Sequence, residues 1–168
     1  MKENDSRVLF NDGKGERPTD APIVVADGLR TPENVGALVR LLANIGSEKL
    51  ILVNSEQMNM AKVKRTACMA WDYVKIETCE AGALGEHIPE GYEMVAVETS
   101  AQSVSIYKTE MPRKVALVLG SEVHGVSAEV LAMCKTHVHI PMTGPDTSMN
   151  VSHAACVALF EWVRRFVG

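Results

Sequence analysis

Residues 22–53 read PIVVADGLRTPENVGALVRLLANIGSEKLILV, and this stretch decides the expected fold. It opens with the short apolar run IVV and closes with LILV, and such runs are typical of buried strands. Between them, the sequence Thr31-Pro32-Glu33 predicts the start of a helix capped by Thr31, and Gly46 predicts its end. A strand, a helix and a second strand in this order predict two parallel strands joined by a crossover.

The same alternation continues along the chain. Further extended segments are predicted at 72–77, 93–98, 115–120 and 137–140, and helices at 60–70, 80–87, 127–134 and 151–166. Because the central strands are continuously apolar, we expect an α/β fold whose mostly parallel sheet carries helices on both faces. Residues 21–168 are predicted to form this one domain, preceded by a loose N-terminal arm of residues 1–20.

Charge and composition narrow the class of protein. The chain of 168 residues carries a net charge of −4, which argues against a protein that coats nucleic acid by bulk charge but allows a local basic patch. Lys62, Lys64 and Arg65 are one candidate for such a patch. No apolar run is long enough for a membrane span, and the N-terminus has no apolar core typical of a secretory signal. We therefore expect a cytoplasmic protein with no membrane partner.

Polar and glycine-rich residues follow several predicted strands. They include Gly28, the run Gly120-Ser121-Glu122, and residues 141–150. The carboxyl ends of parallel strands meet at one edge of a sheet, so these loops should converge on one ligand site. The segment GSEVHG (120–125) lacks the Lys-Ser/Thr of a phosphate-binding loop, and no G-x-G-x-x-G opens a helix, so familiar nucleotide sites are disfavoured. His137 and His139 lack partners at metal spacing, and no metal is predicted.

Arg40 is the only charge between Val35 and Ile45. Apolar residues surround it at every angle of the predicted helix, which predicts a helix buried or covered by a partner chain. A charge in that setting needs a partner or a purpose. One interpretation is an ion pair with Glu122 or Asp146, and the other is a cation facing the ligand pocket. The residues alone leave both open.

Three segments then point to a family. PENVGALVRLLANIG (32–46) is similar to a P-x-N-x-G-x-x-x-R motif, and LVLGSEVHGVS (117–127) is similar to L-x-x-G-x-E-x-x-G. IPMTGPDTSMNVSHAACVALFEW (140–162) is similar to I-P-M followed by S-[LM]-N-[VL]-S and an apolar helix. In this order the chain resembles the SpoU/TrmH family of the SPOUT methyltransferase superfamily. His153 departs from the family pattern, and we interpret it as a helix-face residue.

The resemblance implies a fold and an activity. Members of the family transfer a methyl group from S-adenosylmethionine to a ribose 2′-hydroxyl of RNA, so RNA and not DNA is the expected substrate. The resemblance also implies a homodimer and a C-terminal deep trefoil knot. The loop at 141–150 would wrap the cofactor, and the last helix would pack on both its own sheet and the partner subunit.

Site residues are carried over from the motifs. The cofactor site would comprise Gly120, Ile140, Ser148 and Met149, together with Val97, which matches by position only. The catalytic and RNA-facing positions would be Asn34, Arg40, Glu122, Ser148 and Asn150, with Lys62, Lys64 and Arg65 as further RNA contacts. Because a guanidinium is a poor base, we expect Arg40 to orient a phosphate and to stabilise the developing alkoxide. The proton acceptor is left open among a substrate phosphate, Glu122 and water.

The RNA substrate is less well determined. Family members that act on large-subunit ribosomal RNA often carry an extra N-terminal RNA-binding domain, which twenty residues cannot supply, so tRNA is favoured over rRNA. The D-loop guanosine and wobble-position enzymes are both open. Three competing interpretations are a non-catalytic SPOUT-like RNA-binding protein, a base methyltransferase, and an unrelated doubly wound enzyme. The matching Asn34, Arg40, Glu122 and Asn150 disfavour a non-catalytic protein.

Overall fold

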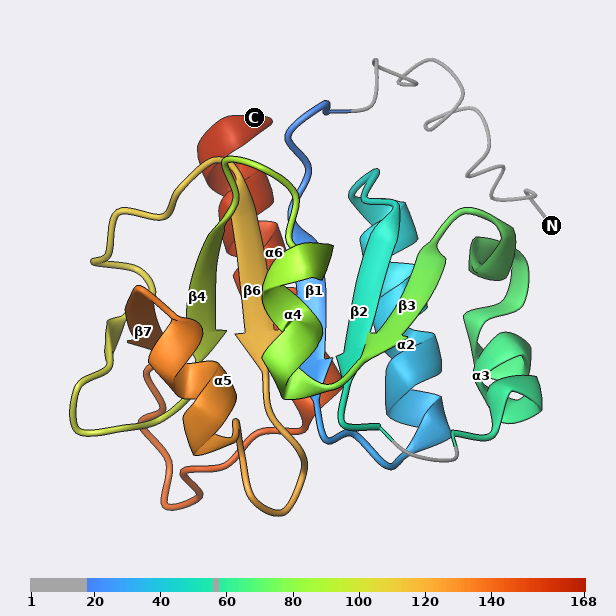
Figure 1. The fold of residues 1–168 in the computed structure, drawn as a ribbon. Helices are drawn as coiled ribbons and strands as arrows, with labels where there is room; N and C mark the ends of the chain where they lie inside the picture. Colours follow the sequence, from blue (N-terminus) through green and yellow to red (C-terminus); the bar gives the residue numbers. More distant parts are fainter. Residues whose placement is uncertain (1–17, 56–57) are drawn as a thin grey trace, which may run out of the picture.

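One parallel sheet organises the chain. In a computed structural model, the structure describes residues 18–55 and 58–168. Within them, seven strands run parallel in the order β3-β2-β1-β6-β4-β7-β5 (Figure 1). The strands are β1 (Ile23–Asp27), β2 (Lys49–Val53), β3 (Lys75–Cys79), β4 (Glu93–Val97), β5 (Val104–Ser105), β6 (Val115–Leu119) and β7 (Thr136–His139).

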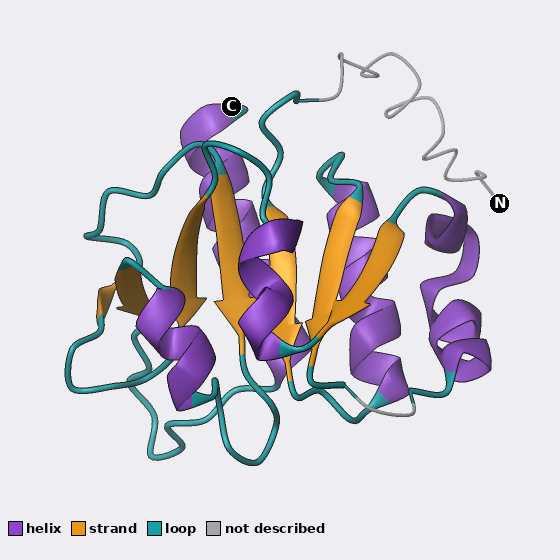
Figure 2. Cartoon of the chain, viewed as in Figure 1, coloured by secondary structure: helices purple, strands orange, loops and turns teal. Residues whose placement is uncertain are grey.

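Helices cover both faces of this sheet (Figures 1 and 2). One face carries α2 (Pro32–Asn44), α3 (Met60–Ala67) and α6 (Val151–Phe166), and the other carries α4 (Leu84–His87) and α5 (Ala128–Met133). Two short 3-10 helices, η1 (Cys68–Asp72) and η2 (Ala81–Ala83), adjoin α3 and α4. The predicted α/β architecture is therefore confirmed.

The central strands are apolar without alternation because both of their faces are buried. In β1, Val24 and Ala26 belong to the core beneath α2 and α6, whereas Ile23 and Val25 belong to the core beneath α4 and α5. All four side chains are at most 5% exposed. Full burial of an aliphatic side chain contributes about 1.5–3 kcal/mol to folding. A run such as IVVA is thus the pattern that a strand between two helical layers requires.

Helix α2 packs closely on α3 and leaves one stripe open. A Cβ atom at Gly36 would lie 2.5 Å from Cβ of Thr66 and 2.8 Å from the Val63 carbonyl oxygen, so only glycine allows this approach. Arg40, by contrast, is exposed. The outward stripe of α2 therefore faces solvent, so the helix is not buried within its own chain, and cover by a partner chain stays a prediction.

Several predicted boundaries differ from the observed ones. The helix predicted at 60–70 ends at Ala67 because Cys68 adopts φ 53°, and the strand predicted at 72–77 lies at Lys75–Cys79 instead. The two-residue strand β5 was not predicted. Thr31 occupies the cap position of α2, yet its side chain caps no helix N–H. Of the predicted arm at residues 1–20, residues 1–17 lie outside the described part of the chain.

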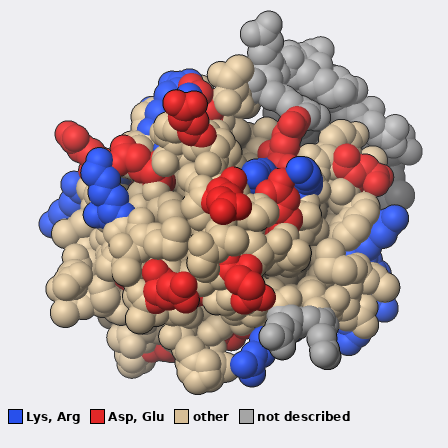
Figure 3. Space-filling view, in the orientation of Figure 1, with Lys and Arg blue, Asp and Glu red and all other residues tan. Residues whose placement is uncertain are grey.

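The surface facing the viewer in Figure 3 has no single charge sign. Acidic side chains lie over the middle of this face, whereas most of the basic side chains in view lie towards its edges. In residues 18–55 and 58–168, no helix is both long and apolar enough to cross a membrane.

Helix α6 is anchored at its C-terminal end by polar contacts. Trp162 is fully buried and its Nε1 donates to the Arg113 carbonyl at 2.8 Å, while Arg165 Nη2 donates to the Ile106 carbonyl at 2.7 Å. Glu161 is only 6% exposed and accepts from Arg164 Nε at 2.8 Å and Arg165 Nε at 2.7 Å. Hydrogen bonds from Arg164 and then Arg165 outweigh the opposing effect of burial and lower the Glu161 pKa to about 2.

Replacing Glu161 by glutamine should make acid stability less pH-dependent. The carboxylate has a folded pKa of about 2 against an ordinary 4.5, so its stabilisation is complete above pH 4.5 and is lost as pH falls towards 2. Urea unfolding from pH 2 to 7 should therefore show Glu161→Gln less stable than the natural chain at neutral pH, with the difference shrinking below pH 4.5. Exposed Glu86→Gln is the matched control, and a difference that stays constant with pH would contradict the assignment.

Candidate functional site

A cavity of about 430 Å³ lies at the carboxyl edge of the sheet. Three loops that follow the neighbouring strands β6, β4 and β7 form its walls together with the first turn of α6. Every position predicted for the cofactor lines it: Val97, Gly120, Ile140, Ser148 and Met149. The convergence expected from the strand order is thus observed, and apolar side chains supply much of the wall.

A tight turn after β6 forms one side of the cavity. Ser121 and Gly125 exchange backbone hydrogen bonds of 3.0 and 3.1 Å. A Cβ atom at Gly120 would lie 2.0 Å from the carbonyl carbon of Gly125, so the two ends of the turn touch through their backbones. Glycine at position 120 is therefore a steric requirement of the turn.

Two carboxylates hold the outgoing end of this turn. Glu98 Oε2 accepts from the Val126 N–H at 3.0 Å, and its Oε1 accepts from the Thr99 N–H at 3.0 Å. Asp27, at the end of β1 and 2% exposed, accepts from the Ser127 N–H at 2.7 Å. Residues at the ends of two strands thereby fix the position of residues 120–127.

Asn34, Glu122 and Asn150 form a hydrogen-bonded chain beside the cavity. Asn34 Nδ2 donates to Glu122 Oε1 at 2.7 Å, and Asn150 Nδ2 donates to Asn34 Oδ1 at 3.2 Å. Asn150 also caps α6, because its Oδ1 accepts from the Ser152 N–H at 2.9 Å. Three residues separated by up to 116 positions are thus brought together, as the motifs predicted.

The ionised form of Glu122 is favoured by its surroundings. Partial burial opposes ionisation, but hydrogen bonds from its own backbone N–H, from Asn34, from the Thr31 hydroxyl and from the Arg30 backbone outweigh it and lower the Glu122 pKa. The Thr31 hydroxyl therefore serves the site instead of the helix cap. A lowered pKa makes this carboxylate a weak proton acceptor.

Asn34→Asp should raise the pKa of Glu122. The substitution replaces the donor at 2.7 Å by a second carboxylate, which removes a favourable hydrogen bond and adds like-charge repulsion. The carboxyl titration of Glu122 followed by NMR should move to higher pH in this variant. Asn44→Asp, at an exposed position of the same helix, should leave it in place. An unchanged Glu122 titration in Asn34→Asp would mean that the contact is absent in solution.

The loop at 141–150 holds itself together by a local turn. Asp146 Oδ1 accepts from both the backbone N–H and the hydroxyl of Ser148 at 2.9 Å, and these bonds lower the Asp146 pKa. The predicted catalytic hydroxyl of Ser148 is therefore already bonded within the loop. Met149 lines the cavity and is 38% exposed, so its apolar side chain is accessible to a ligand.

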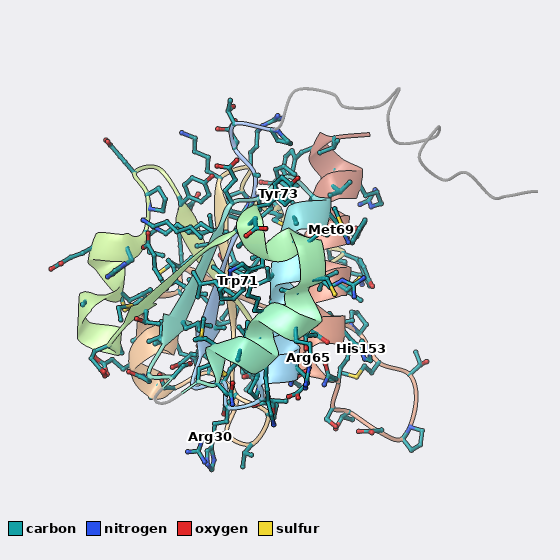
Figure 4. The ribbon with its side chains drawn as sticks, turned by 90° about the vertical axis from the view of Figure 1, so that its right-hand side faces the viewer. Arg30, Arg65, Met69, Trp71, Tyr73 and His153 are labelled. Carbon is teal, nitrogen blue, oxygen red and sulfur yellow. The ribbon has the colours of Figure 1, made fainter. Side chains whose placement is uncertain are left out.

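The structure does not bring the predicted basic residues to the cavity. Arg40 is exposed on α2, and neither Glu122 nor Asp146 pairs with it, so neither interpretation made from the sequence holds within one chain. Lys62, Lys64 and Arg65 are exposed on α3 and line no part of the cavity either. Figure 4 shows Arg65 on this helix. His153 is exposed on α6, as expected for a helix-face residue.

Sequence reasoning missed Glu98 and His139, which both line the cavity. Each follows or ends a strand at the same carboxyl edge as the residues that were found, so the topological rule could have identified them. His139 was considered only as a metal ligand, whereas its Nδ1 lies 3.0 Å from Ser103 Oγ. Within the described part of the chain, no cluster of three or more His, Cys, Asp or Glu could hold a metal ion.

Comparison with known proteins agrees with this architecture. The family model of the SpoU rRNA Methylase family matches residues 21–160. The 23S rRNA (guanosine-2′-O-)-methyltransferase RlmB of Xylella fastidiosa is 32% identical over 167 residues, which cover 98% of this chain and 65% of the relative.

Two solved structures show the same fold. One, described as "Structural insights into the 2-OH methylation of C/U34 on tRNA", has a TM-score of 0.77 and 29% identity and covers 89% of this chain and 98% of its own. An AdoMet-bound rRNA methyltransferase from Sinorhizobium meliloti has a TM-score of 0.79 and 22% identity and covers 90% of this chain and 59% of its own.

A parallel sheet with a cavity at its carboxyl edge and a polar cluster beside it defines an α/β protein whose candidate binding site lies at the ends of its strands. The chain belongs to the SpoU rRNA Methylase family. It spans less than two thirds of the length of the first RlmB relatives that it matches.

Proposed function

We propose that the chain transfers a methyl group from S-adenosylmethionine to a ribose 2′-hydroxyl of RNA. One observation carries this proposal. The cavity that contains Gly120, Ile140 and Met149 lies directly beside the hydrogen-bonded chain Asn34–Glu122–Asn150. A cofactor bound in this cavity would lie next to polar groups suited to a substrate. The RlmB relative and the AdoMet-bound neighbour support the proposal, since their names give the corresponding activity and ligand.

The residues of the cavity suit this cofactor. About 430 Å³ lies in the usual range of small-molecule sites. Apolar walls from Val97, Ile140 and Met149 suit an adenine ring, and the backbone of the turn at Gly120 offers polar groups to its edge. When bound, S-adenosylmethionine would supply an electrophilic methyl group on a positively charged sulfur. The deep trefoil knot implied by the family stays a prediction.

The chain's own residues would orient the attacking hydroxyl. Asn34 and Asn150 would hold the ribose so that its 2′-oxygen faces the methyl group that the cofactor would supply, and the hydroxyl proton would pass to an acceptor. Because its pKa is lowered, Glu122 is better suited to hold Asn34 and the ribose in place than to take that proton. A substrate phosphate and water are the other candidate acceptors of that proton, and Arg40 would stabilise the developing alkoxide.

A homodimer would bring Arg40 to a site. On its own chain Arg40 lies on the exposed stripe of α2, away from the cavity. The neighbouring α6 exposes His153 and Phe160, the latter to 46%, so the two helices together present an uncovered surface with apolar character. Packing of a second copy on this surface would cover Phe160 and carry Arg40 towards the partner's cavity.

Ribosomal RNA is the better-supported substrate. Chain length favoured tRNA, but the relative that matches 98% of this chain is named a 23S rRNA methyltransferase. The structural neighbour whose description concerns nucleotide 34 of tRNA keeps tRNA as the second candidate. The proposal is therefore rRNA 2′-O-methylation, with tRNA as the competing substrate.

The test is methyl transfer from labelled S-adenosylmethionine to two RNAs that lack 2′-O-methylation. Transcribed 23S rRNA and pooled tRNA transcripts are assayed separately, and the labelled nucleotide is mapped by its resistance to alkaline cleavage. Label in one rRNA nucleotide supports the proposal. Label found only in tRNA would show that tRNA, not rRNA, is the substrate. Cofactor binding without transfer to either RNA would contradict the proposed methyltransferase activity.

Arg40→Ala should reduce methyl transfer by about a hundredfold or more, as expected for loss of a group that stabilises developing charge. Cofactor affinity measured by calorimetry should stay within about twofold, because Arg40 lines no part of the cavity. Lys135→Ala removes an exposed cation at the opposite edge of the sheet and should leave transfer unchanged. Full transfer by Arg40→Ala would refute this role.

A second surface is proposed to contact RNA. The α3–η1 surface comprises Lys62, Lys64, Arg65, Met69 and Tyr73, of which Figure 4 labels the last three. Met69 is 80% exposed and Tyr73 54%, and Lys64 Nζ lies 5.7 Å from the Trp71 ring centre. Cations beside exposed apolar and aromatic side chains suit phosphates and unstacked bases respectively.

Changing Lys62, Lys64 and Arg65 together to alanine should weaken RNA binding without changing cofactor binding. Each lost phosphate contact lowers the slope of log affinity against log salt by about 0.7–0.9. Filter binding between 50 and 300 mM salt should therefore show a shallower slope for the triple variant. The variant with Lys114 and Lys135 changed to alanine should keep the natural slope, and equal slopes for all three proteins would contradict the surface.

A further inference from the structure

The charged side chains that line the cavity are predominantly acidic. Glu98 and Glu122 both line it, whereas none of the described residues that line it is a lysine or arginine. Among the described residues that line the cavity, His139 is the other titratable side chain. The first turn of α6 adds a partial positive charge through its backbone, which is smaller than the two carboxylate charges. The cavity therefore has a negative potential.

Glu98 cannot swing away from this position at low cost. Both of its oxygens accept backbone hydrogen bonds, one from Thr99 within its own loop and one from Val126 across the turn. A Cβ atom at Gly125 would lie 2.4 Å from Glu98 Oε2, so the backbone of the turn closes over the carboxylate. The negative charge is thus fixed in the wall.

We infer that Glu98 is a specificity-determining residue that makes the cavity favour the cationic cofactor over its demethylated product. The inference rests on the proposed function. S-adenosylmethionine carries a positive sulfur, which becomes a neutral thioether when its methyl group has left, whereas the rest of the molecule keeps its charges. A fixed carboxylate lowers the free energy of the first state more than that of the second.

This arrangement would assist turnover. A cavity shaped only for adenosine and the amino-acid chain binds cofactor and product alike, and the product then inhibits. A potential that weakens when the sulfur loses its charge favours exchange of product for fresh cofactor. For one carboxylate in a partly open cavity, the discrimination should be about three- to tenfold in affinity.

Calorimetric titration with three ligands tests the inference. S-adenosylmethionine and sinefungin, an analogue with an ammonium group in place of the methylated sulfur, are cationic at that position, and S-adenosylhomocysteine is neutral there. Titrations at pH 8 keep free imidazole mostly uncharged. The natural chain should bind both cationic ligands about three- to tenfold more tightly than the neutral one. In Glu98→Gln this ratio should fall towards one.

The ratio separates charge from structure. Glu98→Gln also disturbs the bond to Val126, which would weaken all three ligands together and leave their ratio unchanged. Glu93→Gln, at the other end of β4 and paired with Lys135 outside the cavity, should keep the natural affinities and ratio. A natural ratio near one, or one that survives Glu98→Gln, would overturn the inference and leave the proposed function standing. Absence of binding for all three ligands to the natural chain would instead refute the proposed function.

Discussion

The contact between the backbones of Gly120 and Gly125 is the constraint on which the site depends. Because the two ends of this turn touch, residues 121–124 must project as a narrow loop from the carboxyl end of β6. Glu122 at its tip then reaches Asn34 at the start of α2, and Asn34 in turn reaches Asn150 at the start of α6. A steric condition on one glycine thus positions the loop that joins the starts of two helices beside the cavity.

The carboxylates and the cations of the candidate site lie in different places and make different contacts. The carboxylates Glu98 and Asp27 act on backbone N–H groups, and Glu122 acts on an amide side chain, so each is held as an acceptor. The cations are placed elsewhere, on the outer stripe of α2 and on α3. One chain therefore supplies two carboxylates to the cavity wall and exposes cations on α2 and α3 outside it, which suits a small cationic ligand inside and a polyanion outside.

The architecture could be predicted from the sequence because strands buried on both faces have continuous apolar runs such as IVV and VALVL. The sequence also placed the cavity, since strand order sends the loops after β4, β6 and β7 to one edge. The prediction from sequence failed where the conformation of a single residue determines where an element ends or which group a side chain contacts. Cys68 takes a positive φ that no residue pattern announces, and Thr31 turns its hydroxyl to Glu122, which is remote from it in the sequence. The exposure of Arg40 was hidden because apolar neighbours on an open stripe resemble those of a buried helix.

The position of helix α6 in the chain affects when the cavity can form during synthesis. Asn150 and Val151 form a wall of the cavity, while Trp162 and Arg165, near the end of the same helix, are fastened to the segment between β5 and β6. A nascent chain that has not yet released residues 151–166 from the ribosome lacks both that wall and its anchor. This wall of the cavity is therefore complete only after residues 151–166 have been made, and a product shortened before them would lack it.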